Sequence, residues 1–340
     1  MTEDILKVDG LKAYYQMSYF GVNREVRAVD DITMTVKKNE VYGIAGESSS
    51  GKTSFIKVLA AALQPPLRVV SGQATYHFAD GDVDVTTASA ARIEAIRWKK
   101  LSYIMQGSMS ALNPLRRIGG LFEDFGSRPL GLSGRAFSRR VVEHLERLKL
   151  NPNILGAYPH ELSGGMRQRV TIGLATVCNP EFVIADEPTT ALDVVVQKDV
   201  LALIRQLRRE IGSSIVFVTH DMSVHANMAD RVGIIYAGRL VEEAPTRELF
   251  TAPKHPYTAH LVASLPRIGD TTQRPALEGR PPNLADPPAG CRFHPRCPLA
   301  IDKCKTDSPP LETVAAGHRS ACWRWQDVEP LVPVHAEAFA

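Results

Sequence analysis

The chain has 340 residues, 44% hydrophobic and 23% charged, a balance that excludes a disordered or fibrous protein. This length predicts more than one domain, because domains usually run to about 100–200 residues. The net charge of +3 is too small to indicate nucleic-acid binding, and no apolar stretch approaches the roughly 20 residues of a membrane helix. The acidic start, residues 1–4, is unlike a secretory signal, so we expect a soluble, cytoplasmic protein.

The first forty residues read as strands, because residues 5–8 and 32–36 alternate apolar and polar side chains. Tyr14 and Tyr15 lie between these two strands and precede a loop. An aromatic side chain here either packs on the sheet or stacks on a nucleotide base, a contact worth about 1–3 kcal/mol. We take Tyr15 as the candidate for base stacking.

A glycine-rich segment follows the apolar run 41–45 and precedes the helix-like run 54–63. It reads Gly46-Glu47-Ser48-Ser49-Ser50-Gly51-Lys52-Thr53, followed by Ser54. Between a strand and a helix this pattern is typical of a phosphate loop, because its glycines let successive N–H groups point inward. Lys52 is placed to reach the β- and γ-phosphates, and the Thr53 hydroxyl to bind Mg²⁺. The alternative is a chance glycine-serine turn.

The next hundred residues begin with a predicted hairpin at 72–86 and end in a helical region. A short helix at 93–98 leads to an apolar strand that ends at Gln106, where the amide can reach a metal or an attacking water. Residues 115–160 contain helical segments at 120–125 and 134–148 and no good strand. We therefore expect a helical insertion, at about 107–160, in an α/β core.

A second anion site is predicted immediately after this region. Ser163 can cap the helical run 170–178, and Gly164 and Gly165 expose N–H groups at its positive end.

Two adjacent carboxylates end the buried strand that follows. Asp186 is expected to hold Mg²⁺ through water, and Glu187 to orient or deprotonate the water that attacks the γ-phosphate. A solvated loop is the alternative for such a pair. Strand 215–219 then delivers His220, which in a parallel sheet lies at the same edge as Glu187.

These motifs, in this order, resemble the ATP-binding cassette (ABC) family over residues 5–250. The resemblance assigns the phosphate loop to 46–53, the glutamine loop to Gln106, the signature to 162–166, the magnesium and catalytic carboxylates to Asp186 and Glu187, the dimer-contact loop to 190–193 and the switch histidine to His220. It implies a P-loop NTPase core with an antiparallel β subdomain. It also implies ATP and Mg²⁺ as ligands and a head-to-tail dimer, in which each ATP lies between the phosphate loop of one subunit and the signature of the other.

The chain departs from the family pattern at three places. Ser49 stands where glycine is usual, Met166 replaces the commoner glutamine, and Gly107 with Ser108 replaces Asp-Pro after Gln106. A positive φ at Ser49 would cost about 1 kcal/mol. No departure removes a reacting group, so we expect an active ATPase.

Beyond residue 250 the sequence resembles the C-terminal extension of ATPases that serve oligopeptide, dipeptide and nickel importers. The residues that carry it are His255-Pro256-Tyr257-Thr258, Leu261 and Ser264-Leu265-Pro266. We therefore expect a nucleotide-binding domain at 1–250 and an extension at 251–340. Six prolines between Pro266 and Gly290 favour an extended connector over a second helical domain.

The five cysteines fall into two groups. Cys178 stands alone in an apolar stretch and is expected in the core. The other four are Cys291, Cys297, Cys304 and Cys322. A reducing compartment argues against disulfides, and the spacing does not fit paired zinc ligands. Four thiolates suit a [4Fe–4S] cluster, and similar tails in peptide-importer ATPases carry one. Zinc, free thiols, and His294 or His318 in place of one thiolate are alternatives.

Few apolar residues lie in 291–322, so we expect a bound metal to order this tail. Because none of the motif residues lies in the tail, we expect the metal to take no part in hydrolysis.

The leading function is an ATPase that powers import of an oligopeptide or dipeptide. The expected partners are a second, paralogous ATPase subunit, two membrane permeases and, indirectly, an extracytoplasmic binding protein. The chain itself is expected at the cytoplasmic face of the membrane. Nickel and oligosaccharide are alternative solutes. A soluble ABC ATPase acting on nucleic acid, and an iron–sulfur redox protein with a regulatory nucleotide site, are the rival functions.

Overall fold

The computed structural model describes residues 3–19, 21–107, 112–190, 192–265 and 277–331. These fall into two compact units, each built from several stretches of sequence. The first contains residues 1–6, 36–40 and 75–217, and the second contains 7–35, 41–74 and 218–340. The proposed division at residue 250 remains a prediction.

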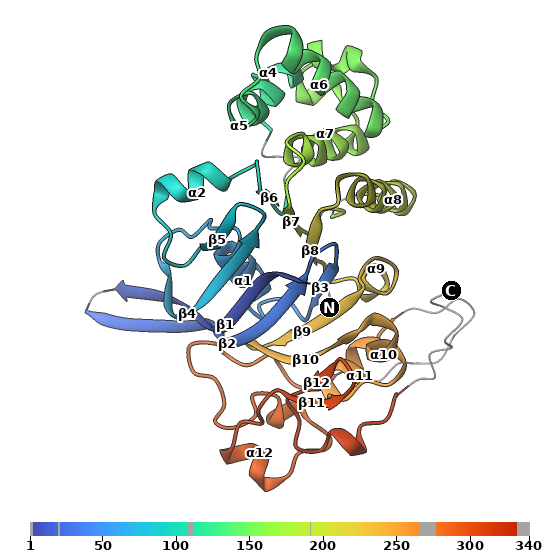
Figure 1. Cartoon of the computed structure of the whole chain (residues 1–340). Helices are drawn as coiled ribbons and strands as arrows, with labels where there is room; N and C mark the ends of the chain where they lie inside the picture. Colours follow the sequence, from blue (N-terminus) through green and yellow to red (C-terminus); the bar gives the residue numbers. More distant parts are fainter. Residues whose placement is uncertain (1–2, 20, 108–111, 191, 266–276, 332–340) are drawn as a thin grey trace. The chain divides into compact units, whose positions relative to one another are not determined.

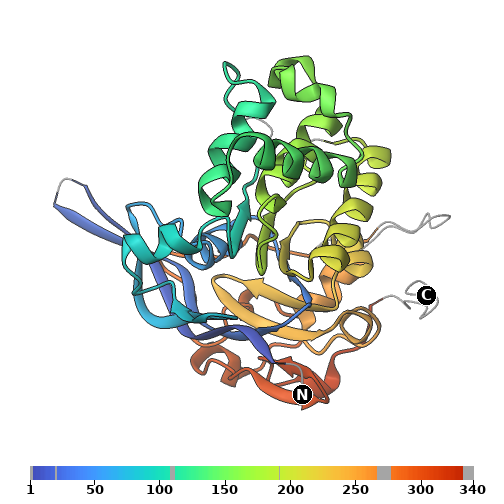
Figure 2. The ribbon, with the colours of Figure 1, turned by 45° about the horizontal axis from the view of Figure 1, so that its top comes forward.

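The second unit contains most of a long β ribbon. Its strands are β1 (Asp4–Tyr19), β2 (Val22–Lys37) and β4 (Leu67–Phe78), in the order β2-β1-β4. β1 and β2 form the extended blue pair in Figure 2. The sequence predicted a loop after Tyr15, but β1 continues to Tyr19. Gly72 allows the close approach of β4, because a Cβ there would lie 2.3 Å from the Gly10 carbonyl oxygen.

A mixed sheet forms the centre of the same unit. Its strands, in spatial order, are β11 (Glu312–Ala315), β12 (His318–Ser320), β10 (Arg239–Pro245), β9 (Arg231–Tyr236) and β3 (Val41–Ala45). β3 and β9 are parallel, whereas β9, β10, β12 and β11 pair antiparallel. The C-terminal extension therefore adds two strands to the sheet that contains β3, as Figure 1 shows.

The same unit contains helices and a core rich in aromatic side chains. The helices are α1 (Lys52–Leu59), α9 (Met222–Met228), α10 (Thr246–Thr251), α11 (Pro256–Ala263) and α12 (Asp302–Thr306). Phe293 of the extension is buried in the apolar core beside Tyr236 and Tyr257, with ring centroids 5.2 and 5.5 Å away. The extension thus shares the core of the unit.

The first unit contains three adjacent strands, β8 (Ser214–Val218), β7 (Phe182–Asp186) and β6 (Leu101–Ile104). β6 and β7 are parallel, with Leu101 opposite Phe182 and Ile104 opposite Ala185. A further strand, β5 (Gly81–Asp84), pairs antiparallel with the end of β4.

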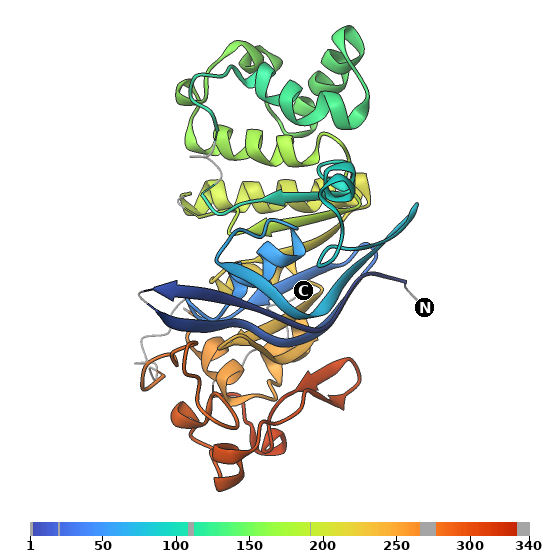
Figure 3. The same ribbon diagram turned by 90° about the vertical axis from the view of Figure 1, so that its left-hand side faces the viewer.

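The helices of this unit include the predicted helical region. They are α2 (Ala90–Ile96), α4 (Ile118–Phe122), α5 (Arg128–Leu130), α6 (Gly134–Arg147), α7 (Gly164–Thr176) and α8 (Val194–Ile211). α4, α5 and α6 group together in Figure 1, and α7 runs beside α8 in Figure 3. Gly173 makes the packing on α7 tight, because a Cβ there would lie 2.5 Å from Leu148 Cδ1. Cys178 is buried, as predicted.

Among the residues that the structure describes, no helix combines the length and apolar character needed to cross a membrane.

Candidate nucleotide-binding and hydrolysis site

The phosphate loop connects β3 to α1 and has the backbone that the motif requires. Gly46 and Gly51 have φ values of 148° and 103°. A Cβ at Gly46 would lie 2.2 Å from the Ile235 carbonyl oxygen, and one at Gly51 would lie 1.9 Å from that of Ala28. Neither position admits a side chain. Ser49 has φ 64°, so the left-handed backbone considered from the sequence is present at a non-glycine residue.

The loop provides hydrogen-bond acceptors for its own lysine. The Lys52 ammonium donates to the carbonyl oxygens of Gly46 and Glu47, both at 2.7 Å, and to Ser50 Oγ at 3.3 Å. Thr53 is exposed at the start of α1, whereas Ser54 is buried. The Thr53 hydroxyl is therefore the more accessible candidate for binding Mg²⁺.

The two tyrosines of β1 have different surroundings. Tyr14 is buried and its hydroxyl donates to Asp30. Tyr15 is half-buried, and its hydroxyl lies 3.0 Å from Ser54 Oγ, directly after the phosphate loop. Its position suits the predicted contact with a base, and the stacking remains a prediction.

The predicted catalytic residues of the first unit meet at the ends of β6 and β7. Gln106 Nε2 donates to Glu187 Oε2 at 2.9 Å, and Thr190 Oγ1 donates to the same oxygen at 2.9 Å. Asp186 is buried, with the Tyr103 hydroxyl 3.4 Å from its carboxylate. The parallel register of β6 and β7 explains why Gln106 and Glu187 come together. Sequence reasoning placed Thr190 in the dimer-contact loop and missed its contact with Glu187.

Backbone strain accompanies this arrangement. Glu187 has φ 47°, in the left-handed region, and such strain clusters at functional sites.

Ser163 caps α7 as predicted, since its Oγ accepts from the Met166 N–H at 3.3 Å, but the helix begins at Gly164 and not at residue 170. A Cβ added to Gly164 would meet no atom within 4 Å. The backbone is therefore open at Gly164, whereas a Cβ at Gly165 would lie 2.8 Å from Val196 Cγ1.

His220 is exposed after β8, and the next residue, Asp221, caps α9. Sequence reasoning missed His225 on that helix. It is fully buried, and its Nε2 lies 3.1 Å from the Thr219 carbonyl oxygen. Burial lowers the pKa of His225 to about 4, so the ring is neutral and can donate this hydrogen bond.

The four C-terminal cysteines are free of disulfide bonds. Burial, followed by the charges of neighbouring cysteines, raises the pKa of Cys297 to about 11 and that of Cys322 to about 12. Backbone N–H groups point at three of the sulfurs, from Phe293 to Cys291, Leu299 to Cys297 and Arg324 to Cys322.

No three Cys, His, Asp or Glu side chains of the described residues form a site for a single metal ion. The two histidines considered as ligands are otherwise engaged: His318 Nε2 lies 2.6 Å from Glu242 Oε1, and His294 Nδ1 lies 2.9 Å from the Cys291 carbonyl oxygen.

Comparisons with known proteins decide the family. Residues 29–190 match the family model "ABC transporter", and residues 241–304 match "Oligopeptide/dipeptide transporter, C-terminal region". A relative from Brucella abortus, named as a peptide import ATP-binding protein, is 39% identical over 346 residues, covering 96% of this chain and 98% of the relative. The chain belongs to the ABC transporter ATPases.

A further relative and a solved structure agree with this assignment to the ABC ATPases. The dipeptide transport ATP-binding protein DppD of Caldanaerobacter subterraneus is 36% identical, covering 96% of this chain and 99% of the relative. Among solved structures, the dimeric bacterial ABC transporter cassette MJ0796 has a TM-score of 0.60 and 25% identity, over 71% of this chain and 98% of that cassette. The predicted P-loop fold with mixed α/β sheets and the ATPase activity are thereby confirmed, and ATP with Mg²⁺ are the ligands that the family implies.

Proposed function

We propose that this ABC ATPase hydrolyses ATP to power the import of an oligopeptide or dipeptide through a membrane transporter. The observation that carries the proposal is the match of residues 241–304 to the oligopeptide/dipeptide transporter region. The match lies in a chain that aligns along nearly its whole length with peptide-import and dipeptide-transport proteins. It favours peptides over nickel or oligosaccharide as the solute.

The contacts within each unit support specific roles in hydrolysis. Lys52 and the inward N–H groups of the phosphate loop bind phosphate, and Thr53, Gln106 and Asp186 are the proposed ligands of Mg²⁺. When bound, Mg²⁺ neutralises phosphate charge. The hydrogen bonds from Gln106 and Thr190 orient the Glu187 carboxylate. This carboxylate accepts the proton of the attacking water.

We assign the signature residues Ser163, Gly164 and Gly165 to the ATP of a partner subunit in a head-to-tail dimer, with a paralogous ATPase as the partner. The open space beside Gly164 supports this assignment, and the structure of MJ0796 is dimeric. His220 serves as the switch histidine. Two permeases and an extracytoplasmic binding protein complete the transporter, with this subunit at the cytoplasmic face of the membrane.

Co-purification tests the proposal. The tagged chain, expressed from its native host, is expected to bring down two membrane proteins and a second ATPase, and the complex to take up labelled dipeptide when ATP is supplied. A complex that transports nickel or oligosaccharide but no peptide would contradict the proposal that the solute is a peptide. Recovery of the tagged chain without any membrane protein would contradict the proposal that it is a transporter subunit.

We also propose that Cys291, Cys297, Cys304 and Cys322 hold a [4Fe–4S] cluster. In such a cluster each thiolate binds a different iron, so the sulfurs stand further apart than around a single ion. The N–H groups directed at three of the sulfurs suit this chemistry, because hydrogen bonds to sulfur stabilise thiolate ligands.

Metal analysis of anaerobically purified protein tests this proposal. We expect about four irons per chain with matching sulfide, and loss of both in the Cys297→Ser/Cys304→Ser variant. One zinc per chain without iron would contradict the cluster.

A further inference from the structure

Glu47 of the phosphate loop has all its polar groups engaged. Its carbonyl oxygen accepts from the Lys52 ammonium at 2.7 Å. Its N–H donates to the Tyr257 hydroxyl at 2.7 Å, and its carboxylate accepts from two nitrogens of Arg296 at 2.9 and 3.1 Å. Two of these three partners, Tyr257 and Arg296, lie in the part of the chain that matches the peptide-transporter C-terminal region. The extension therefore touches the loop one residue after its first glycine.

The Arg296 contact is fixed in place by further bonds. Its side chain is 6% exposed, and it also donates to the Glu278 carbonyl oxygen at 3.0 Å and to the Tyr236 hydroxyl at 3.3 Å. Burial lowers its pKa, but the hydrogen bonds to Glu47 and Tyr236 more than offset burial, so its pKa lies above the ordinary value. The guanidinium remains charged, and the two-pronged geometry fixes both the position and the direction of the Glu47 carboxylate.

The position of Glu47 matters for phosphate binding because the same residue helps to place Lys52. Ser48 and Ser49, the next two residues of the loop, are exposed, and the next anchored residue is Ser50, whose carbonyl oxygen accepts from the Gly238 N–H at 2.7 Å. A shift of Glu47 would therefore move the first half of the loop together with a carbonyl ligand of Lys52.

We propose that Arg296 and Tyr257 are positioning residues that hold the phosphate loop through Glu47, so that the C-terminal extension sets the affinity of this subunit for ATP. Neither side chain needs to touch the nucleotide. The expectation from the sequence was that the tail is separate from hydrolysis, because none of the motif residues lies in it. Arg296, 249 residues from Glu47, gives it a direct contact with the loop.

ATP titration of the purified full chain tests the proposal. Arg296→Met removes the guanidinium and keeps much of the stem, and Glu47→Gln removes the charge at the other end of the pair. Each is expected to raise the dissociation constant and the KM for ATP about tenfold, with kcat at saturating ATP within about twofold, because a ground-state binding contact is lost. The double variant should bind no more weakly than the weaker single variant, since both remove the same contact.

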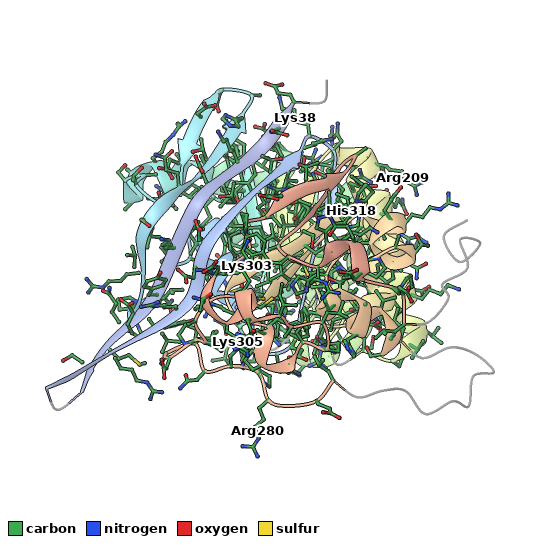
Figure 4. The ribbon with its side chains drawn as sticks, turned by 90° about the horizontal axis from the view of Figure 1, so that it is seen from below. Lys38, Arg209, Arg280, Lys303, Lys305 and His318 are labelled. Atoms are coloured by element: carbon green, nitrogen blue, oxygen red, sulfur yellow. The ribbon has the colours of Figure 1, made fainter. Side chains whose placement is uncertain are left out.

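Matched variants separate positioning from general damage. Arg280, an exposed arginine of the same extension that points outward in Figure 4, provides the control, and Arg280→Ala should leave the ATP affinity unchanged. Arg296→Lys should recover part of the loss. Tyr257→Phe keeps the ring in the core and should weaken ATP binding about threefold through the lost hydroxyl alone.

Circular dichroism and thermal melting confirm that each variant is folded. If Arg296→Met does not fold, Glu47→Gln and Tyr257→Phe carry the test. An unchanged ATP dissociation constant in the folded variants would overturn the proposal. A double variant whose loss equals the product of the two single losses would also overturn it.

Discussion

Ser49 occupies a backbone conformation that favours glycine, with φ 64° in the middle of the phosphate loop. A side chain in the left-handed region costs of the order of 1 kcal/mol. Ser49→Gly should therefore raise the free energy of unfolding, by up to about 1 kcal/mol after the greater flexibility of glycine in the unfolded chain is subtracted. Urea denaturation measures the change. Ser48→Gly, at a neighbouring residue without a positive φ, should give no gain, and equal effects of the two variants would refute the explanation.

Thr190 is the second donor to the Glu187 carboxylate, beside Gln106. Thr190→Val keeps the shape of the side chain and removes one hydrogen bond, worth about 1 kcal/mol. We expect kcat to fall about fivefold with little change in KM for ATP, because the loss is felt when the carboxylate must hold the attacking water. Steady-state ATPase assays measure kcat and KM. A raised KM with normal kcat would indicate that Thr190 acts in nucleotide binding instead.

These residues also show which part of the site a sequence can predict. The phosphate loop and the pair Asp186 and Glu187 were recognisable, because their chemistry depends on a fixed local spacing beside an apolar strand. Thr190 and Arg296 were not, because a hydroxyl in a turn and an arginine in a distant tail have no pattern that reveals their partners. The Arg296 contact depends on folding of the whole second unit.

At the scale of elements, the helical segments of the first unit are expected to receive the membrane partner. Leu115, just before α4, is 87% exposed and is therefore accessible to a partner. Leu115→Glu should reduce peptide transport at least about threefold while basal ATPase activity stays within about twofold. Transport and ATPase assays on the assembled complex measure both.

Arg209→Ala on α8 is the control for this prediction, since Arg209 is exposed and lies outside residues 107–160. A parallel fall of transport and hydrolysis in Leu115→Glu would contradict the prediction that residues 107–160 link the membrane partner to ATP hydrolysis.

The C-terminal extension was only partly predictable as an element. Its prolines indicated an extended connector, and its few apolar residues suggested a tail that needs metal to become ordered. The structure adds two features: β12 pairs with β10, with Glu243 opposite Arg319, and Phe293 enters the core between aromatic residues of the ATPase. Both depend on partners far away in the sequence, which local composition does not reveal.

At the scale of the whole molecule, buried neutral histidines make stability depend on pH. Burial lowers the pKa of His144 and His255 to about 3 and that of His225 to about 4, with Arg140 and Arg147 adding to the effect at His144. In the unfolded chain these rings bind a proton near pH 6.5. Between that pH and about 4 the unfolded state therefore binds more protons, and the free energy of unfolding falls as the pH falls.

The expected loss is up to about 1.4 kcal/mol per pH unit for each histidine over this range. Urea denaturation at pH 7 and pH 5 measures it. His144→Gln, which no longer titrates, should show a smaller difference between the two pH values than the unaltered chain. Equal stability of the unaltered chain at pH 7 and pH 5 would contradict the neutral state of these rings.

The most direct test of the account is peptide uptake by the assembled transporter in vesicles, with Glu187→Gln compared with the unaltered chain. Gln keeps the shape of the side chain but cannot accept a proton from water, so ATP should still bind while turnover falls at least about a hundredfold and uptake of labelled dipeptide ceases. Glu248→Gln, at an exposed glutamate of α10, should retain both activities. Near-normal hydrolysis and uptake in Glu187→Gln would contradict the claim that this chain powers import through Glu187.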